Sequence, residues 1–271
     1  MSKGVLIDLT KCVGCGSCTV ACKLWNETKF QDKTPSTGDN AKLTSENWTV
    51  VKRHEVETNG EPAWRFVKEQ CLHCVHPACA SACFSKALQK TPEGPVVYYP
   101  DLCVGCRYCM VSCPFSIPKY QWEKALPFVT KCQMCATRLE HGEAPACVSV
   151  CPTGVMKFGD RDELLKEAKS ILANNKNYVQ KIYGENEVGG TSWLYISDIP
   201  FEQLGFKTGL TTKPLPEYTH DGFLKFTPFI AAGWGLLLSG MYFYTRRRKE
   251  MAQAKDQEKN PDKKDDHTLR S

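Results

Sequence analysis

The residues of this chain that could do chemistry are its sixteen cysteines, which fall into four sets of four with none left over. The first and third sets share the spacing C-x2-C-x2-C-x3-C, the second has four residues in its middle gap, and the fourth has eleven. The four sets are Cys12, Cys15, Cys18 and Cys22; Cys71, Cys74, Cys79 and Cys83; Cys103, Cys106, Cys109 and Cys113; and Cys132, Cys135, Cys147 and Cys151.

This spacing suits iron–sulfur chemistry. Three thiolates two residues apart can surround three corners of one iron–sulfur cube, and in two-cluster ferredoxins the fourth cysteine binds the neighbouring cluster. Gly14, Gly16 and Gly105 lie between the cysteines, where the backbone needs positive φ and a close approach. The near copies CVGCGSC and CVGCRYC indicate a duplicated ferredoxin-type unit. The sequence therefore predicts four [4Fe–4S] clusters as cofactors.

Zinc and disulfides are the competing interpretations of the cysteines. Structural zinc is usually held by two separated pairs of ligands, so it has no use for three cysteines within seven residues. Disulfides do not explain why every set carries a C-x2-C pair, because a two-residue loop is strained. A zinc-binding membrane assembly protein therefore stays the less favoured alternative.

The clusters also change the charge. The formal net charge is +5, but four clusters of roughly 2− each, thiolates included, bring it to −3. A nucleic-acid partner is accordingly not expected. Five cations flank the motifs and either offset cluster charge or are ordinary solvated side chains: Lys11, Lys23, Arg107, Lys119 and Lys131.

The remaining sequence predicts an α+β fold: two intertwined two-cluster ferredoxin-like modules in residues 1–160, followed by one C-terminal transmembrane helix. A strand is expected over residues 5–9. Residues 23–70 form an insertion whose hairpin spans 48–67 and turns at Asn59 and Gly60. Another strand pair is expected around residues 91–99, and a helix over 161–175.

Residues 161–222 form an extension that we expect to contact a partner subunit or the membrane. Its apolar stretch 189–206 has no clear periodicity, so packing within this chain is equally compatible. His73 and His76 lie inside the complete second cysteine set, where supporting roles are expected rather than metal ligation. With no nucleotide-binding loop or Ser-His-Asp arrangement in sight, the chain is predicted to be a non-catalytic subunit.

A transmembrane helix is predicted over residues 223–246, because twenty uncharged residues, 226–245, suffice to cross a bilayer. Ala231, Gly235 and Ser239 form a small-residue stripe for packing against another helix. The segment contains no histidine, so it cannot supply an imidazole ligand to haem.

The cations RRRK that follow the apolar run indicate orientation. The positive-inside rule places residues 247–271, expected to be a disordered charged tail, in the cytoplasm and the cysteines on the periplasmic face of the inner membrane. The N-terminus MSKGVLIDLTKC has no signal-peptide pattern. We therefore expect export of the folded chain bound to a partner that carries a twin-arginine signal.

The four cysteine sets resemble those of the electron-transfer (beta) subunits of membrane-bound molybdopterin oxidoreductases and some respiratory hydrogenases. The resemblance covers residues 1 to about 160. The C-terminal helix after a GGT segment is most similar to formate dehydrogenase beta subunits and hydrogenase-2-type iron–sulfur subunits. Lys23 and Phe84 depart from the pattern, since they replace the proline that follows the other sets.

The resemblance implies which cysteines share a cluster, because in that family the first set pairs with the fourth and the second with the third. Carried over to this sequence, it assigns cluster A to Cys12, Cys15, Cys18 and Cys151; cluster B to Cys22, Cys132, Cys135 and Cys147; cluster C to Cys71, Cys74, Cys79 and Cys113; and cluster D to Cys83, Cys103, Cys106 and Cys109.

The implied function is electron transfer between two partners. One is a catalytic subunit, either a molybdopterin or tungstopterin protein of formate dehydrogenase type or a NiFe hydrogenase. The other is an integral membrane subunit that binds haem b or quinone. An electron-transfer subunit of a polysulfide or thiosulfate reductase is the alternative within the same class.

Overall fold

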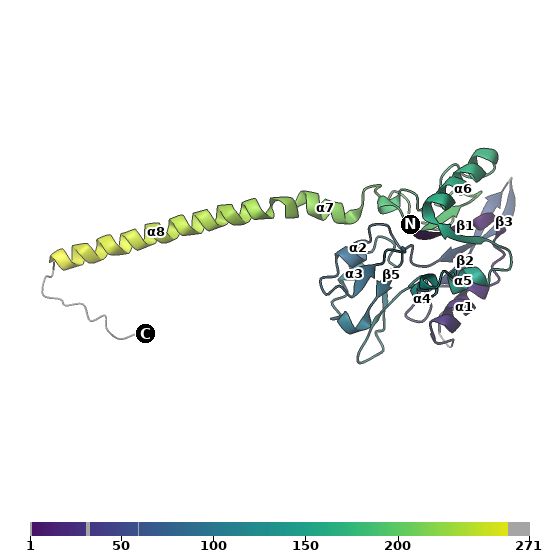
Figure 1. Ribbon diagram of the computed structural model, residues 1–271, viewed down its shortest axis with the longest axis horizontal. Helices are drawn as coiled ribbons and strands as arrows, with labels where there is room; N and C mark the ends of the chain where they lie inside the picture. The colour runs from purple at the N-terminus through teal and green to yellow at the C-terminus, as the bar shows by residue number, and fades with distance from the viewer. Residues whose placement is uncertain (1, 31–32, 59, 260–271) are drawn as a thin grey trace. The chain divides into compact units, whose positions relative to one another are not determined.

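The computed structural model describes residues 2–30, 33–58 and 60–259, and the chain divides into two units, Met1–Glu217 and Tyr218–Ser271 (Figure 1). The strands are β1 (Lys3–Asp8), β2 (Val50–Thr58), β3 (Glu61–Glu69), β4 (Leu88–Lys90), β5 (Val96–Tyr98), β6 (Lys119–Tyr120), β7 (Val129–Thr130), β8 (Met156–Asp160) and β9 (Trp193–Ile196). The α-helices are α1 (Ser17–Trp25), α2 (Ala78–Ser81), α3 (Tyr108–Ser112), α4 (Ala136–Glu140), α5 (Ala146–Ser149), α6 (Arg161–Asn174), α7 (Leu215–Gly222) and α8 (Thr227–Lys259). Four 3-10 turns are η1 (Leu9–Lys11), η2 (Pro100–Leu102), η3 (Glu187–Gly189) and η4 (Leu224–Phe226).

A three-stranded sheet of order β8-β1-β9 organises the first unit. The apolar run Val5-Leu6-Ile7 occupies its central strand and is at most 4% exposed, as a strand covered on both faces requires. β1 pairs antiparallel with β8 and parallel with β9. The predicted helix is α6, which lies over the sheet (Figure 1) and buries Leu164 and Ala168 against one face. The start of the chain is thereby fixed to its residues 156–196.

The predicted hairpin is present as β2 and β3, which pair from Val50 with Glu69 to Thr58 with Glu61. Of its predicted turn, Gly60 has a φ of +81°, whereas Asn59 lies outside the described residues. The strand pair expected around residues 91–99 is β4 and β5. Helices and strands are mixed, in agreement with the predicted α+β class.

The stretch 189–206 packs inside its own chain. Its β9 joins the central sheet, and Trp193, Leu194, Tyr195 and Ile196 are at most 1% exposed. Phe201 is equally buried. Packing within the chain, one of the two expected alternatives, therefore accounts for the apolar residues of this stretch, and its contact with a partner or the membrane stays a prediction.

The second unit is built around α8. In the described part of the chain one helical segment, Leu215–Lys259, is long and apolar enough to cross a membrane, and none of it is buried. Gly235 of the predicted small-residue stripe has no atom within 4 Å of an added Cβ.

The expected disorder from residue 247 differs from the structure, where α8 continues through Lys259. Its sequence RRRKEMAQAKDQEK explains the difference, because nearly all these residues favour helix. Residues 260–271 of the expected tail lie outside the described residues.

Candidate iron–sulfur centres

All sixteen cysteines are free thiols, so the structure contradicts the disulfide interpretation. Twelve of them line three cavities, four in each. Cavity A is lined by Cys12, Cys15, Cys18 and Cys151. Cavity B is lined by Cys22, Cys132, Cys135 and Cys147. Cavity D is lined by Cys83, Cys103, Cys106 and Cys109.

The remaining four cysteines form group C, which is Cys71, Cys74, Cys79 and Cys113. Burial first, and then the nearby thiolates of Cys71, Cys113 and Cys79, raise the pKa of the Cys74 thiol well above its ordinary value. Cys113 also packs against the buried Cys71 in one cluster. The structure thus brings twelve cysteines together in three groups of four, each with the donor set of one [4Fe–4S] cluster, and leaves four further cysteines for group C.

Tight loops hold these cysteines. Gly14 has a φ of +69°, and a Cβ at this position would lie 2.4 Å from the ring of Phe66. Gly16 precedes α1 with a φ of +75°, and Arg107 precedes α3 in the same left-handed conformation with a φ of +59°. Such loops turn backbone N–H groups inward; for example, the Met134 N–H donates to Cys132 Sγ at 3.3 Å. The residues present therefore fit the predicted clusters.

Neighbouring groups are joined by the last two cysteines of each set. Cys18 and Cys22 are four residues apart in α1, yet Cys18 lines cavity A and Cys22 lines cavity B. Four residues of helix rise about 6 Å. The other sets have the same arrangement, with Cys147 and Cys151 in cavities B and A, Cys79 and Cys83 in group C and cavity D, and Cys113 and Cys109 in group C and cavity D.

Burial suppresses ionisation of the metal-free thiols. It raises the pKa of Cys18 and Cys109 to about 11 and that of Cys22 and Cys79 to about 12. These thiols are therefore neutral near pH 7 before a cluster binds. Because iron is bound by thiolate, cluster insertion must displace their protons.

The five flanking cations differ in their exposure to solvent. Lys11 and Arg107 are exposed; Lys11 pairs with Asp8 at 3.1 Å and Arg107 stacks on Tyr120 and Trp122. Lys131, in contrast, is 3% exposed, and its Nζ donates to the carbonyls of Val96 and Cys132.

The other two flanking lysines bind backbone carbonyls. Lys119 donates to Ser116 at 2.9 Å, and the buried Lys23 donates to Lys29 at 2.6 Å. Lys131 is thus the one of the five whose buried ammonium lies beside a predicted ligand.

The two histidines of the second set differ in their surroundings. His73 is fully buried and its Nδ1 accepts the Val96 N–H at 2.8 Å, which ties β5 to the cysteine loop. His76 is exposed. Over the described residues, no group of three or more His, Cys, Asp or Glu side chains could hold a single metal ion.

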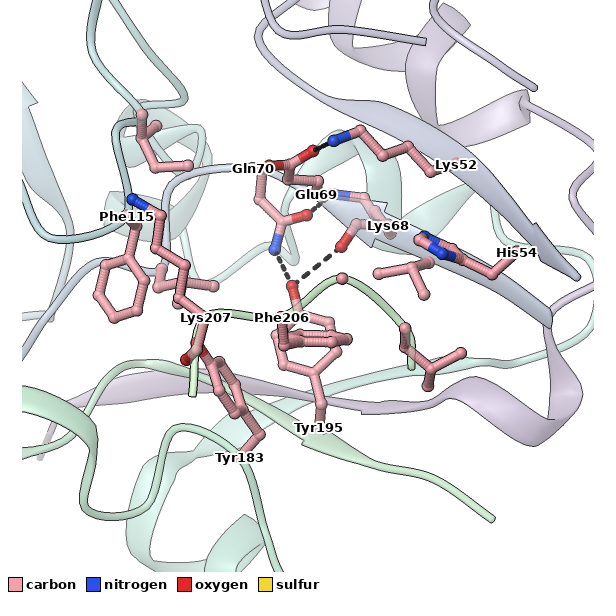
Figure 2. Close-up of a pocket in the computed structure, with 15 residues that line it drawn as sticks. Lys52, His54, Lys68, Glu69, Gln70, Phe115, Tyr183, Tyr195, Phe206 and Lys207 are labelled. Atoms are coloured by element: carbon pink, nitrogen blue, oxygen red, sulfur yellow. Dashed lines mark hydrogen bonds and ion pairs between the residues drawn. The ribbon is translucent and has the colours of Figure 1, made fainter. Parts of the chain in front are cut away.

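Sequence reasoning missed Lys68, which lies on β3 among ordinary strand residues. It lines both cavity A and cavity B. Burial alone would lower the pKa of the Lys68 ammonium. Together, the nearby thiolates of Cys147, Cys18, Cys132 and Cys22 raise this pKa by more than burial lowers it, so that it stands above its ordinary value. Lys68 also borders a third cavity between the β2–β3 ribbon and Tyr195, where Gln70 meets both side chains (Figure 2).

Comparisons with known proteins agree with this geometry. Two family models, each described as a 4Fe-4S dicluster domain, match residues 11–87 and 62–161. A Nitratidesulfovibrio vulgaris protein is 43% identical over 258 residues, which are 93% of this chain and 69% of that protein. The nitrate-inducible formate dehydrogenase iron-sulfur subunit of Escherichia coli K12 is 36% identical over 88% of this chain and 83% of its own length.

A third relative is the hydrogenase-2 operon protein HybA of Escherichia coli O157:H7, 35% identical over 75% of this chain and 72% of its own length. The chain belongs to this family of ferredoxin-type iron–sulfur subunits. Two dicluster domains account for four [4Fe–4S] clusters, for which sixteen cysteines are the required number. Membership of this family therefore decides against the zinc interpretation and assigns the chain to electron transport.

Proposed function

We propose that this iron–sulfur subunit relays electrons between a catalytic subunit of formate dehydrogenase or NiFe hydrogenase type and a membrane subunit that binds haem b or quinone, and has no catalytic site of its own. The observation that carries the proposal is the serial arrangement of the four cysteine groups. When bound, the clusters take up and release single electrons. The chain's own part is to hold them in line and to insulate them from water.

The series runs A, B, C, D. Cavities A and B are joined through α1, and group C and cavity D through the last two cysteines of the second and third sets. Cavity B and group C are adjacent, because Cys132 of cavity B and Cys71 of group C pack together with Ile117 in one buried apolar region. In this proposal each cluster takes its ligands from two cysteine sets, so the two ferredoxin-like modules are intertwined.

The ends of the series reach the surface. Cys15 of cavity A and Cys106 of cavity D are exposed, whereas every cysteine of cavity B and group C is buried or half-buried. Exposed apolar side chains lie next to the cysteines at each end: Val13, beside Cys12 of cavity A, is 59% exposed, and Val104, beside Cys103 of cavity D, is 61% exposed. Both ends therefore suit partner subunits, one that delivers electrons and one that accepts them.

The second unit supports membrane attachment. We propose that α8 crosses the inner membrane once, with RRRK on the cytoplasmic side and the cysteines on the periplasmic side. Protease treatment of intact spheroplasts tests this orientation. Cleavage of the cysteine domain is expected, and its protection would overturn the orientation.

The names of the relatives favour formate dehydrogenase or hydrogenase over a polysulfide or thiosulfate reductase, since the relatives reported above carry the first two. Molybdenum, tungsten and nickel analysis of the complex purified from membranes distinguishes these partners. Nickel without molybdenum or tungsten indicates the hydrogenase type.

The ligand groups are tested by removing neighbouring cysteines one at a time. Cys18→Ala is expected to alter the EPR signal of cluster A, and Cys22→Ala a different signal, that of cluster B, although the two lie in one helix. Cys151→Ala should reproduce the Cys18→Ala spectrum. The grouping is overturned if Cys18→Ala and Cys22→Ala change the same signal.

A further inference from the structure

Lys68 is a buried cation that has no carboxylate partner. Its side chain is on β3, the residue is 3% exposed, and among the described residues no Asp or Glu forms an ion pair with it. Burying an unpaired ammonium is costly, so buried charges in proteins are generally paired. An anion is therefore required close to Lys68.

The surroundings of Lys68 indicate where that anion lies. Its side chain lines cavity A together with Cys18, and cavity B together with Cys22 and Cys147. Each of these cavities holds the four thiolates of one predicted cluster, whose total charge is negative in both redox states. Lys68 is thus in position to face both clusters at once.

A closed hydrogen-bond ring holds the ammonium in place. Lys68 Nζ donates to Gln70 Oε1 at 2.8 Å, Gln70 Nε2 donates to Tyr195 Oη at 2.7 Å, and Tyr195 Oη donates to the Lys68 carbonyl at 3.0 Å. Figure 2 shows the three side chains converging. Trp193 supports the ammonium from its ring face, with 4.6 Å between Nζ and the ring centroid.

The ammonium has hydrogens left over. It carries three N–H donors, and within the described part of the chain Gln70 is the one hydrogen-bond acceptor of Lys68 Nζ. Lys131, another buried lysine beside a predicted ligand, instead has two backbone carbonyls as acceptors. The two remaining donors of Lys68 are therefore available to the sulfurs of clusters A and B.

We propose that Lys68 is a positioning residue that sets the reduction potentials of clusters A and B together. This inference rests on the proposed grouping of the cysteines. Reduction adds one electron from the donor subunit to a cluster, breaks no bond and leaves the lysine protonated. A fixed positive charge stabilises the more negative reduced form, so it raises both potentials. One residue thereby raises the potentials of clusters A and B relative to those of clusters C and D.

The test is redox titration of the purified complex, followed by EPR. Lys68→Met retains much of the side-chain volume but removes the charge. The reduction potentials of clusters A and B, followed by their EPR signals, are expected to become more negative together. The expected shift is about 59 mV or more, the constant for a tenfold change in a one-electron equilibrium. Signals C and D should shift less because they lie farther away.

Gln70→Glu provides a second route to the same result. It leaves Lys68 in place but sets a carboxylate beside the ammonium, so A and B should again shift to more negative potentials. Lys68→Arg keeps the charge and should remain near wild type. Should Lys68→Met fail to take up its full iron and sulfide, the Gln70→Glu titration decides.

Lys52→Met is the matched control. Lys52 is on β2 opposite Val67, so it leaves the opposite face of the ribbon from Lys68, and it pairs with Glu69 at 2.6 Å. Its loss should leave all four potentials unchanged. Unchanged potentials in fully loaded Lys68→Met or Gln70→Glu, or equal shifts in all four signals, overturn the proposal. The cysteine variants above test the grouping separately, because they identify signals A and B whatever Lys68 does.

Discussion

Cys71 and Cys132 lie in one buried apolar cluster with Ile117, although they belong to the second and the fourth cysteine sets. This contact differs from the other links in the series, which join cysteines four residues apart in one set. The junction between B and C therefore depends on tertiary packing alone. It brings the loop that follows β3 against the loop that follows β7.

Cys132→Ala should interrupt the series at this junction. We expect the complex to reduce a soluble dye from its electron donor at nearly the wild-type rate, because dyes accept electrons at or near the catalytic subunit. Quinone reduction should fall by an order of magnitude or more. Parallel assays with dye and quinone measure the split. Equal retention of both activities would mean that electrons bypass this position.

Gly14→Ala should damage cavity A. The φ of +69° costs an alanine roughly 1–2 kcal/mol, and the new Cβ would lie 2.4 Å from the Phe66 ring. The iron content should decrease, and the thermal midpoint, followed by loss of cluster absorbance, should fall by several degrees. Gly142→Ala is the control, since Gly142 has a φ of +73° but no atom within 4 Å of an added Cβ. Its midpoint should fall less, and its iron content should remain complete. Equal losses in the two variants would exclude the contact with Phe66 as the cause.

His54 should make stability depend on pH. Burial first and Lys52 second lower the pKa of its imidazole, and its Nε2 is buried without a hydrogen-bond partner in the described residues. The fold therefore holds the neutral form. The contribution of neutral His54 to the free energy of unfolding is complete above the pKa of about 6.5 that histidine has in the unfolded chain. It is lost as the pH falls below that value, because only the unfolded chain then binds the proton readily.

The measurement compares wild type with His54→Gln. Between about pH 7.5 and about pH 5.5, the thermal midpoint of wild type should fall further than that of the variant. Acid lability of the clusters affects both proteins equally, so the difference between them isolates His54. Parallel curves would contradict the role assigned to its burial.

The sequence predicts the ligands better than their surroundings. Cysteine spacing is local, so the four sets, their tight glycine loops and the adjacent helices follow from the chain itself. Lys68 could not be recognised, because on a strand it differs in no pattern from Lys52, and its burial arises from tertiary packing against Trp193, Gln70 and the cysteine loops. The stretch 189–206 lacked periodicity because four consecutive residues of β9 are buried, which removes the alternation of a half-exposed strand. Charge suggested disorder beyond residue 247, whereas helix propensity extends α8 to Lys259.

The small-residue stripe on α8 yields the last prediction. Ala231, Gly235 and Ser239 are four residues apart, so they lie on one face of the helix, and all three are exposed. A partner helix that packs there would be displaced by a large side chain. Gly235→Leu is therefore expected to reduce co-purification of the membrane subunit and quinone reduction, while dye reduction persists. Gly233→Leu, two residues away and thus on a different face, is the matched control and should retain both. If the two variants behave alike, the stripe is not the packing surface, and α8 serves as an anchor only.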